Sequence, residues 1–311
     1  KDNLINGLTY ERAYGGEYNK DEFIPGIYLE NNFNWRSNAV QVITGLRVDH
    51  HKEFGTFVTP RSLFKYNFTE NTTARFCFGS GWRTVNLFTE YIQVLSSNMN
   101  IIIDENLNPE KAINFGANFL HSISRENLNI QFIFDFYKTS FQNQIFPEYF
   151  KDSENIYFEN IDGKSVSKSF QTDITFEFYE KYKLKLAYNY LDVFRMEHGH
   201  KHQFPFYSKH HALSTFSYQP ADKDWHFDTR LHWFGKKKII NTNNSGYSQT
   251  YNGHTSDFSD PFTTISAQIT KEFNDFEVYF GCENILNFRQ ENPLINPENP
   301  FNYEFDIANT W

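Results

Sequence analysis

The residues best suited to bind a metal ion are histidines spaced two positions apart. His198, His200 and His202 alternate along the chain, and His210 and His211 follow shortly afterwards. Alternate residues of an extended chain share a face, and imidazole suits zinc, copper or nickel. The spacing therefore predicts His198, His200 and His202 as candidate metal ligands. The competing interpretation is a solvated histidine-rich loop, because no carboxylate or thiolate partner can be assigned from the sequence.

Sequence signatures of catalysis are missing from this chain. It contains no Gly-x-Ser-x-Gly nucleophile motif, no His-Glu-x-x-His motif and no glycine-rich phosphate loop. Carboxylates are numerous but have no fixed spacing. We therefore expect no enzymatic activity, no catalytic residues and no cofactor.

The composition combines many aromatic residues with a polar average. The 35 Phe, 19 Tyr and 5 Trp make up 19% of 311 residues, while 22% are charged and the mean hydropathy is −0.63. No apolar run reaches the roughly 18 residues of a membrane-spanning helix. A net charge of −9, from 29 basic and 38 acidic residues, argues against a nucleic-acid partner. Short strands with one apolar face suit this composition.

Apolar and polar residues alternate with the period of a β-strand in many segments. Trp225, Phe227 and Leu231 fall on one face of such a segment, whereas Asp228 and Arg230 fall on the other. Counting these segments predicts about thirteen strands. They are expected near 3–15, 22–35, 38–50, 58–69, 73–85, 110–121, 127–141, 165–179, 183–196, 207–219, 224–237, 261–273 and 276–288.

The predicted connections alternate between short and long. Short ones fall at 69–73, 122–126 and 179–183, and the longest at 86–109, 142–164 and 239–260. All the long loops therefore emerge at one end of the sheet. The strand phases also place Cys77 and Cys282 on opposite faces, so we expect both to be unpaired.

This pattern predicts an all-β fold, an antiparallel transmembrane β-barrel. Strands of ten or more residues with tight turns on one rim and long loops on the other are typical of outer-membrane barrels. Lipid requires every backbone amide to be paired within the protein, which forces such a sheet to close. A soluble sandwich or propeller also has alternating strands, but its outer face should be polar.

Several short motifs, in order along the chain, resemble the barrel of TonB-dependent receptors, especially those of Bacteroidota. They are Gly45-Leu-Arg47-Val-Asp49, Thr59-Pro60-Arg61, the Gly79-Ser-Gly81-Trp82-Arg83 stretch with Asn86 and Glu90, Leu107-Asn-Pro109-Glu110, and Glu283-Asn284-Ile-Leu286. No single motif is specific, but their order covers nearly the whole chain from about residue 22 onward.

The resemblance implies that residues 1–311 are part of a larger receptor. They would supply about 13 of about 22 strands, with the plug domain, the early strands and the closing strand outside this sequence. It also implies an outer-membrane receptor of a Gram-negative bacterium that imports a scarce solute, first of all an iron-siderophore or another metal chelate. The implied partners are outer-membrane lipid and, through the missing N-terminal part, the TonB–ExbB–ExbD complex.

The resemblance places three ligand-binding candidates near the long-loop rim, where the family captures its ligand. These are Trp82, Arg83 and Glu90. Most other inward-facing polar residues, such as Arg75 and Glu110, are expected to pair with one another in the wet interior of a barrel. Two alternative functions stay open at this point: a soluble all-β glycan- or ligand-binding module, and a passive porin-type channel.

Overall fold

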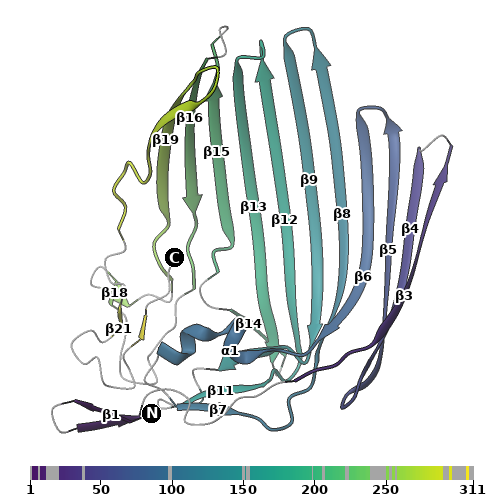
Figure 1. Ribbon diagram of the computed structural model, residues 1–311, viewed down its shortest axis with the longest axis vertical. Helices are drawn as coiled ribbons and strands as arrows, with labels where there is room; N and C mark the ends of the chain where they lie inside the picture. Colours follow the sequence, from purple (N-terminus) through teal and green to yellow (C-terminus); the bar gives the residue numbers. More distant parts are fainter. Residues whose placement is uncertain are drawn as a thin grey trace.

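The computed structural model describes residues 21–289 except for short gaps, together with four short strand segments. The gaps are 37–38, 97–99, 149–150, 152–154, 198, 205–206, 221–223, 239–249, 252–253 and 256–257, and the added segments are 2–5, 8–11, 294–295 and 306–307. Within these ranges the fold is almost entirely β-structure (Figure 1). None of the described helices is long and apolar enough to cross a membrane.

A single antiparallel sheet of thirteen strands dominates the protein, which confirms the all-β prediction. Strands adjacent in the chain are in most cases adjacent in the sheet, as tight turns between antiparallel strands dictate. The sheet contains β3 (Gly26–Trp35), β4 (Val40–His51), β5 (Gly55–Thr69), β6 (Thr72–Arg83), β8 (Glu110–Arg125), β9 (Leu128–Gln142), β12 (Lys164–Phe178), β13 (Tyr182–Glu197), β14 (His200–Gln203), β15 (His210–Tyr218), β16 (Trp225–Phe234), β19 (Phe262–Glu272) and β20 (Glu277–Cys282).

The sheet curves into a wall with tight turns at one end and long connections at the other (Figure 1). Both cysteines are unpaired, as expected, with Cys77 on β6 and Cys282 on β20. The prediction of one strand over 3–15 is wrong. In its place β1 (Asp2–Ile5) and β2 (Leu8–Glu11) pair with each other and not with the large sheet. The Asn-Gly pair between them in the sequence favours a two-residue hairpin turn.

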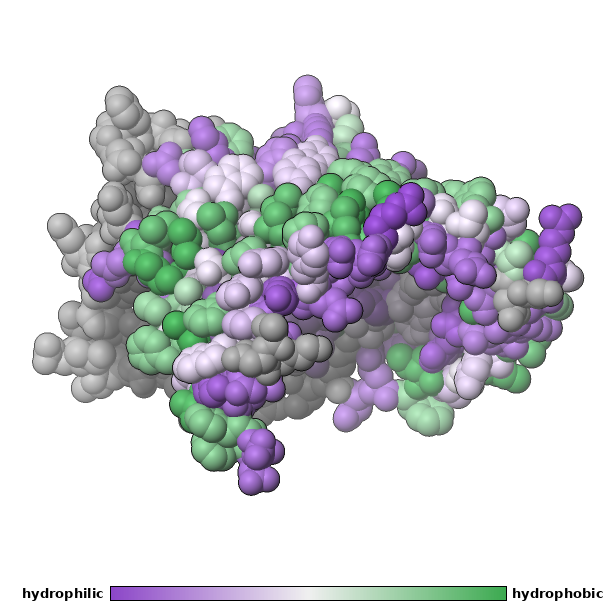
Figure 2. All heavy atoms as spheres, turned by 90° about the horizontal axis from the view of Figure 1, so that it is seen from above, coloured by the Kyte–Doolittle hydropathy of each residue, from purple (hydrophilic) through white to green (hydrophobic). Residues whose placement is uncertain are grey.

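The two faces of the sheet differ in polarity. On one face, which we call inward, Arg75 donates a 2.7 Å hydrogen bond to Asn118, whose amide donates at 2.9 Å to Asp135. On the other face, called outward, neighbouring residues of β9 are aromatic, and Phe134 and Phe136 are 37% and 47% exposed. A view along the strands from the tight-turn end shows hydrophobic side chains gathered in a band beside hydrophilic ones (Figure 2). The outward face of the sheet is thus apolar and exposed, whereas the exposed face of a soluble sheet is polar.

The principal hydrophobic core of the described residues lies in the long connections. The described residues of 84–109 and 143–163 form a unit that we call the loop subdomain, lying across the loop-side end of the sheet (Figure 1). It contains α1 (Leu87–Glu90), the 3-10 helix η1 (Ile92–Ser96), β7 (Asn100–Ile103), β10 (Ile145–Glu148) and β11 (Asn155–Asn160). Strand β11 pairs antiparallel with β10 and parallel with β7. The two long loops are therefore joined by backbone pairing.

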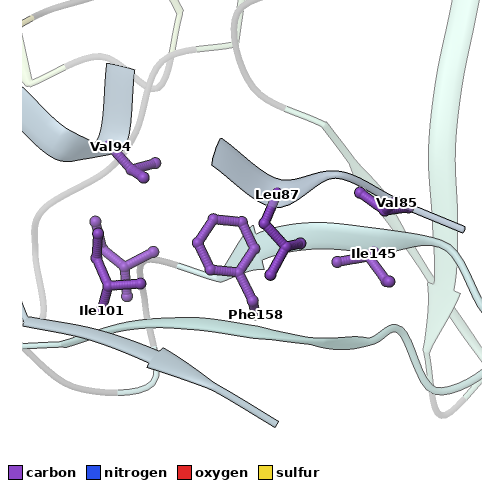
Figure 3. Close-up of a cluster of buried hydrophobic side chains, with 7 residues drawn as sticks. Val85, Leu87, Val94, Ile101, Ile145 and Phe158 are labelled. Carbon is purple, nitrogen blue, oxygen red and sulfur yellow. The ribbon is translucent and has the colours of Figure 1, made fainter. Parts of the chain in front are cut away.

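Seven apolar side chains fill the interior of the loop subdomain (Figure 3). They are Val85, Leu87, Val94, Ile101, Ile145, Ile156 and Phe158. The sheet has one lipid-type face and one wet face, so it offers no dry interior of its own. A loop of this length is ordered only when it buries apolar surface, which offsets the conformational entropy lost on folding.

Candidate functional site

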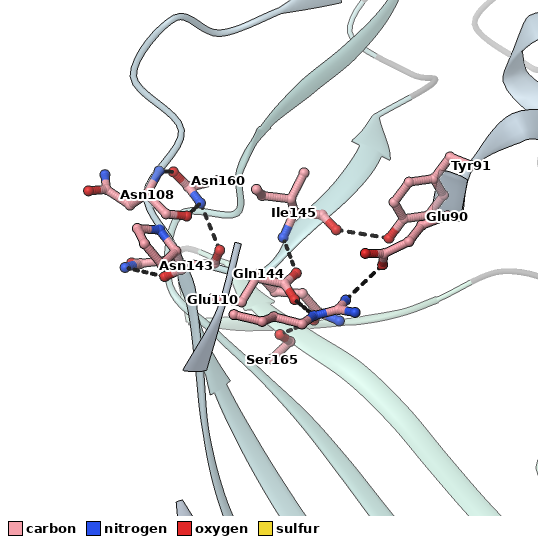
Figure 4. A network of polar contacts seen from close by, with 11 residues as sticks. Glu90, Tyr91, Asn108, Glu110, Asn143, Gln144, Ile145, Asn160 and Ser165 are labelled. Atoms are coloured by element: carbon pink, nitrogen blue, oxygen red, sulfur yellow. Dashed lines mark hydrogen bonds and ion pairs between the residues drawn. The ribbon is translucent and has the colours of Figure 1, made fainter. Parts of the chain in front are cut away.

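Arg83 connects the end of the sheet to the loop subdomain. It stands opposite Glu110 in the register of β6 and β8, and its Nε donates to the Glu110 carboxylate at 2.7 Å. Its Nη2 lies 2.9 Å from the carboxylate of Glu90 at the end of α1 (Figure 4). The helix begins at Asn86, whose side chain accepts a hydrogen bond from the amide of Thr89, as an N-cap residue does. One guanidinium thus joins a strand to a helix.

Glu110 also binds the backbone of the second long loop. Glu110 is only 5% exposed. Its Oε1, the oxygen that does not bind Arg83 Nε, accepts the Ile145 N–H at 2.8 Å. The Tyr91 hydroxyl donates to the carbonyl oxygen of Ile145 at 3.0 Å (Figure 4). Burial, reinforced by the charges of Glu110 and Glu90, raises the pKa of Tyr91 to about 12, so the phenol stays a protonated donor at neutral pH. Side chains therefore satisfy both backbone polar groups of Ile145.

An asparagine-rich group fixes the other side of the loop subdomain. The side-chain amide of Asn160 donates to the carbonyl oxygens of Asn108 and Asn143, at 2.9 and 2.7 Å. Its oxygen accepts the backbone N–H of Asn108 at 2.7 Å. Nearby, the Ser165 hydroxyl donates to Gln144. Figure 4 shows these contacts beside the glutamate network. The ends of β8, β9, β11 and β12 are therefore tied together.

Trp82 belongs to a neighbouring aromatic cluster. Its ring stacks on Phe57 with centroids 3.8 Å apart and planes 11° apart. Its Nε1–H donates to Asp49 at 3.3 Å, and both oxygens of the same carboxylate share the single Arg47 Nε–H, at 2.8 and 2.9 Å. Asp49 is buried, and these donors satisfy both of its oxygens. The cluster presents an aromatic surface next to a balanced ion pair.

A recess opens beside Trp82 where two neighbouring strands separate. Pairing of β5 with β6 stops at Arg61 and Gly79, whereas β6 stays paired with β8 as far as Arg83. The wedge between the separated strands is partly open and has a volume of about 430 Å³. Its lining includes Phe57, Trp82, Lys111, Gln142 and Lys164. It combines apolar rings with ammonium groups.

The structure divides the three predicted ligand-binding residues between two clusters. Arg83 and Glu90 form a direct ion pair, whereas Trp82 contacts other partners. Reasoning from sequence missed that Glu110 binds the backbone N–H of Ile145 and Tyr91 binds its carbonyl oxygen. The Leu-x-Pro-Glu motif marked Glu110 as a strand start, but nothing local to it identifies a partner 35 residues away.

The structure tests the histidine prediction only in part. His198 lies outside the described residues. His200 and His202 lie on β14, in register with Glu197 and Arg195 of β13. In the part of the chain that the structure describes, no group of three or more His, Cys, Asp or Glu residues could hold a metal ion. The metal site at these three histidines stays a prediction.

Several inward arginines are bound by acceptors from nearby strands, as expected for the wet interior of a barrel. Arg61 forms an ion pair with Glu30, and Arg195 Nη1 lies 2.6 Å from Glu148. Because the second pair joins β13 to β10, it adds another link between the sheet and the loop subdomain. Paired charges of this kind order the inward face without leaving buried groups unsatisfied.

Comparison with known sequences identifies one family. Residues 2–285 match the family described as "TonB dependent receptor-like, beta-barrel". A search of curated protein sequences finds no match.

Solved structures of similar fold are receptors and transporters. A mutant of the ferric enterobactin receptor PfeA from Pseudomonas aeruginosa is 16% identical with a TM-score of 0.61, covering 86% of this chain and 40% of that one. The siderophore receptor PirA from Acinetobacter baumannii is 14% identical with a TM-score of 0.64, covering 85% and 41%. The copper transporter OprC is 12% identical with a TM-score of 0.61, covering 84% and 41%. At these identities the likeness shows the fold alone.

Proposed function

Because the chain belongs to the TonB dependent receptor-like β-barrel family, we propose that it forms part of an active transporter for a scarce solute. Members of this family lie in the outer membrane of Gram-negative bacteria and are transporters rather than enzymes. The apolar outward face and polar inward face agree with that location. A soluble binding module has no support, because its outer face would be polar.

The chain spans about 40% of the length of the solved structures that it matches. We propose that the plug domain, the early strands and the closing strand belong to the same protein outside these 311 residues. Coupling to the TonB–ExbB–ExbD complex would then act through that part. The resemblance to receptors of Bacteroidota also stays a prediction.

The substrate that the site favours is an iron-siderophore or another metal chelate. The observation that carries this choice is the ordered loop subdomain, fixed across the loop-side end by the Arg83–Glu110–Ile145 contacts. Beside it lies the Trp82–Phe57 stack. Aromatic faces and guanidinium groups suit organic chelators with aromatic or carboxylate groups. The similar structures named for ferric enterobactin, a siderophore and copper support the same class of cargo.

Within this proposal Trp82 stacks on the chelate, while Arg83 and Glu90 contact it at the base of the loop subdomain. The Arg83 side chain is still 55% exposed although two carboxylates bind it, so part of the guanidinium remains accessible to a ligand. Glu90 is 29% exposed. The ion pair would also keep the binding surface in place before the ligand arrives, which lowers the entropic cost of binding.

Replacement of Trp82 by alanine tests the binding role. In cells that carry the complete receptor, binding of ⁵⁵Fe-labelled catecholate and hydroxamate chelates is expected to weaken at least tenfold. A stacked aromatic contact contributes about 0.5–1.5 kcal/mol beyond the area it buries, and loss of a hot-spot residue costs about 2 kcal/mol or more. Trp225→Ala removes an outward tryptophan at the tight-turn end of β16 and is the matched control. Equal binding by the Trp82 and Trp225 variants would contradict the assignment.

Energy dependence separates active transport from a passive channel. Uptake by an active transporter should stop when a protonophore collapses the inner-membrane potential, whereas surface binding persists. Uptake that continues at the same rate would favour the porin-type alternative. Failure of the unmodified receptor to bind any metal chelate would reject the proposed substrate class.

The outward face of β9 provides a test of membrane placement. Phe134→Lys puts a charge among lipid-facing aromatics and is expected to destabilise the folded receptor by about 2 kcal/mol. Gln131→Lys adds the same charge on the inward face of the same strand and should have little effect. The measurement is urea unfolding of the receptor in vesicles, with the heat-modifiable shift in electrophoretic migration as the readout of the folded fraction. Equal destabilisation by both variants would contradict the assignment of the two faces.

A further inference from the structure

On the four central strands β8, β9, β12 and β13, lysines occupy outward positions only at the loop-side end. Directly paired residues share a face, so the register of β8, β9, β12 and β13 defines rows that cross the sheet. One row contains Lys111, Gln142, Lys164 and Met196. Trp82 stands opposite Lys111 in the register, but the separation of β5 from β6 lets its ring reach Phe57 and Asp49. A second contains Phe115, Lys138, Lys168 and Asp192. The two rows lie about 13 Å apart along the strands, four residues at about 3.3 Å each.

The rows on the tight-turn side of these lysines are apolar and aromatic. The next outward row contains Ala117, Phe136, Phe170 and Tyr190. Phe115, Phe136 and Phe170 are all exposed large hydrophobic side chains. Such a change from aromatic to cationic rows is what a protein presents where the acyl chains of a bilayer meet the headgroups.

Among the residues that the structure describes, none neutralises the positive charge of these four lysines. Lys138 and Lys168 stand directly opposite each other, an arrangement that is destabilising for like charges. None of Lys111, Lys138, Lys164 and Lys168 forms an ion pair with another described residue, and all four are exposed.

Asp192 is the one carboxylate at an outward position of these four strands, all of which the structure describes. It binds two other cations. Lys201 Nζ lies 2.6 Å from one of its oxygens and Lys209 Nζ lies 3.2 Å from the other. Lys201 also lies over the ring of Phe194, 4.1 Å from its centroid. This carboxylate is thus occupied, and the lysine rows keep a net positive charge.

The recess between β5 and β6 lies at the end of the first lysine row. Lys111, Gln142 and Lys164 line it from outward positions, next to Trp82. Lys111 Nζ lies 5.3 Å from the centroid of the Phe57 ring. A group entering this recess from outside would meet two ammonium groups and an amide over an aromatic base. Those donors suit a phosphate ester.

We propose that the outward rows containing Lys111, Lys138, Lys164 and Lys168 bind the phosphate groups of outer-leaflet lipids. The ammonium groups meet the phosphates while the aromatic rows contact the acyl chains. The occupant is a lipid and not a free anion, because the cationic rows continue directly into the apolar band. Lipid phosphate also relieves the repulsion between Lys138 and Lys168.

The test compares lipids that differ only in phosphate. The complete receptor is placed in nanodiscs of phosphatidylcholine that contain diphosphorylated lipid A or lipid A stripped of its phosphates, and retained lipid A is counted by native mass spectrometry. We expect at least threefold higher retention of the diphosphorylated form. Equal retention of the two forms overturns the proposal, and this comparison needs no variant.

Two double variants locate the site on the sheet. Lys138→Gln with Lys168→Gln, and Lys111→Gln with Lys164→Gln, should each lower retention of diphosphorylated lipid A at least threefold. The matched control is Lys52→Gln with Lys181→Gln, two exposed lysines in turns outside the rows. Heat-modifiable migration verifies folding. Retention that is unchanged in both folded double variants, or lowered equally in the control, places the lipid elsewhere and overturns the assignment.

Discussion

Replacement of Phe158 by alanine is expected to unfold the loop subdomain and leave the large sheet folded. Phe158 is 0% exposed at the centre of the apolar cluster, and its ring lies 5.6 Å from that of Tyr91. Removing a fully buried phenyl group costs about 3–5 kcal/mol. A subdomain with seven buried apolar side chains has a small free energy of unfolding, so a loss of this size is enough to unfold it.

Hydrogen exchange on the complete receptor measures this effect directly. Amides of β7, β10 and β11 should lose protection in the Phe158→Ala variant, while those of β8 and β9 keep it. Chelate binding should fall more than tenfold, because the proposed binding surface is no longer held in place. Phe76→Ala removes the same ring from an outward position where it is 54% exposed, and it should leave loop protection unchanged. Protected β7 and β11 amides in the Phe158 variant would contradict a single cooperative subdomain.

Replacement of Glu110 by alanine is expected to detach the loop subdomain from the sheet. The change removes the acceptor of the Ile145 N–H and one of the two carboxylates that bind Arg83. The expected cost is about 3 kcal/mol, at the low end for a broken buried ion pair, because the half-exposed guanidinium stays partly hydrated. Chelate uptake should fall at least tenfold even though the strands still pair.

Graded variants separate the two roles of Glu110. Glu110→Gln keeps an acceptor for the Ile145 N–H but loses the charge, so it should be intermediate in loop protection and uptake. Arg83→Ala combined with Glu110→Ala should cost less than the sum of the single changes if the two residues interact directly. Glu126→Ala, in the tight turn at the opposite end of β8, is the control. Strict additivity of the Arg83 and Glu110 effects would contradict the coupling.

Most strands of the sheet could be predicted from the sequence because their signal is local. Alternation within one segment, as in Trp225 to Phe234, needs no knowledge of the partner strand. The exception at 3–15 shows the limit of that signal. A hairpin of two short strands and one long strand share the same alternation, and only the turn between them distinguishes the two.

The candidate site was less accessible to sequence reasoning because its contacts join distant segments. Trp82 and Arg83 are adjacent in the chain and are predicted to form one site, yet neighbouring residues of a strand project to opposite faces. The separation of β5 from β6 then decides that Trp82 reaches Phe57. No local sequence pattern predicts where β5 and β6 separate.

The sequence by itself determined the fold class, the polarity of the two faces and the end from which the long loops emerge, since each depends on periodicity and spacing within the chain. Only the tertiary structure decided that two of those loops fold together. Ile101 meets Ile156 through parallel pairing of β7 with β11, across 55 residues of sequence. Parallel strands cannot be joined by a short turn, so their pairing depends on burial that becomes possible only after the sheet has brought the loops together.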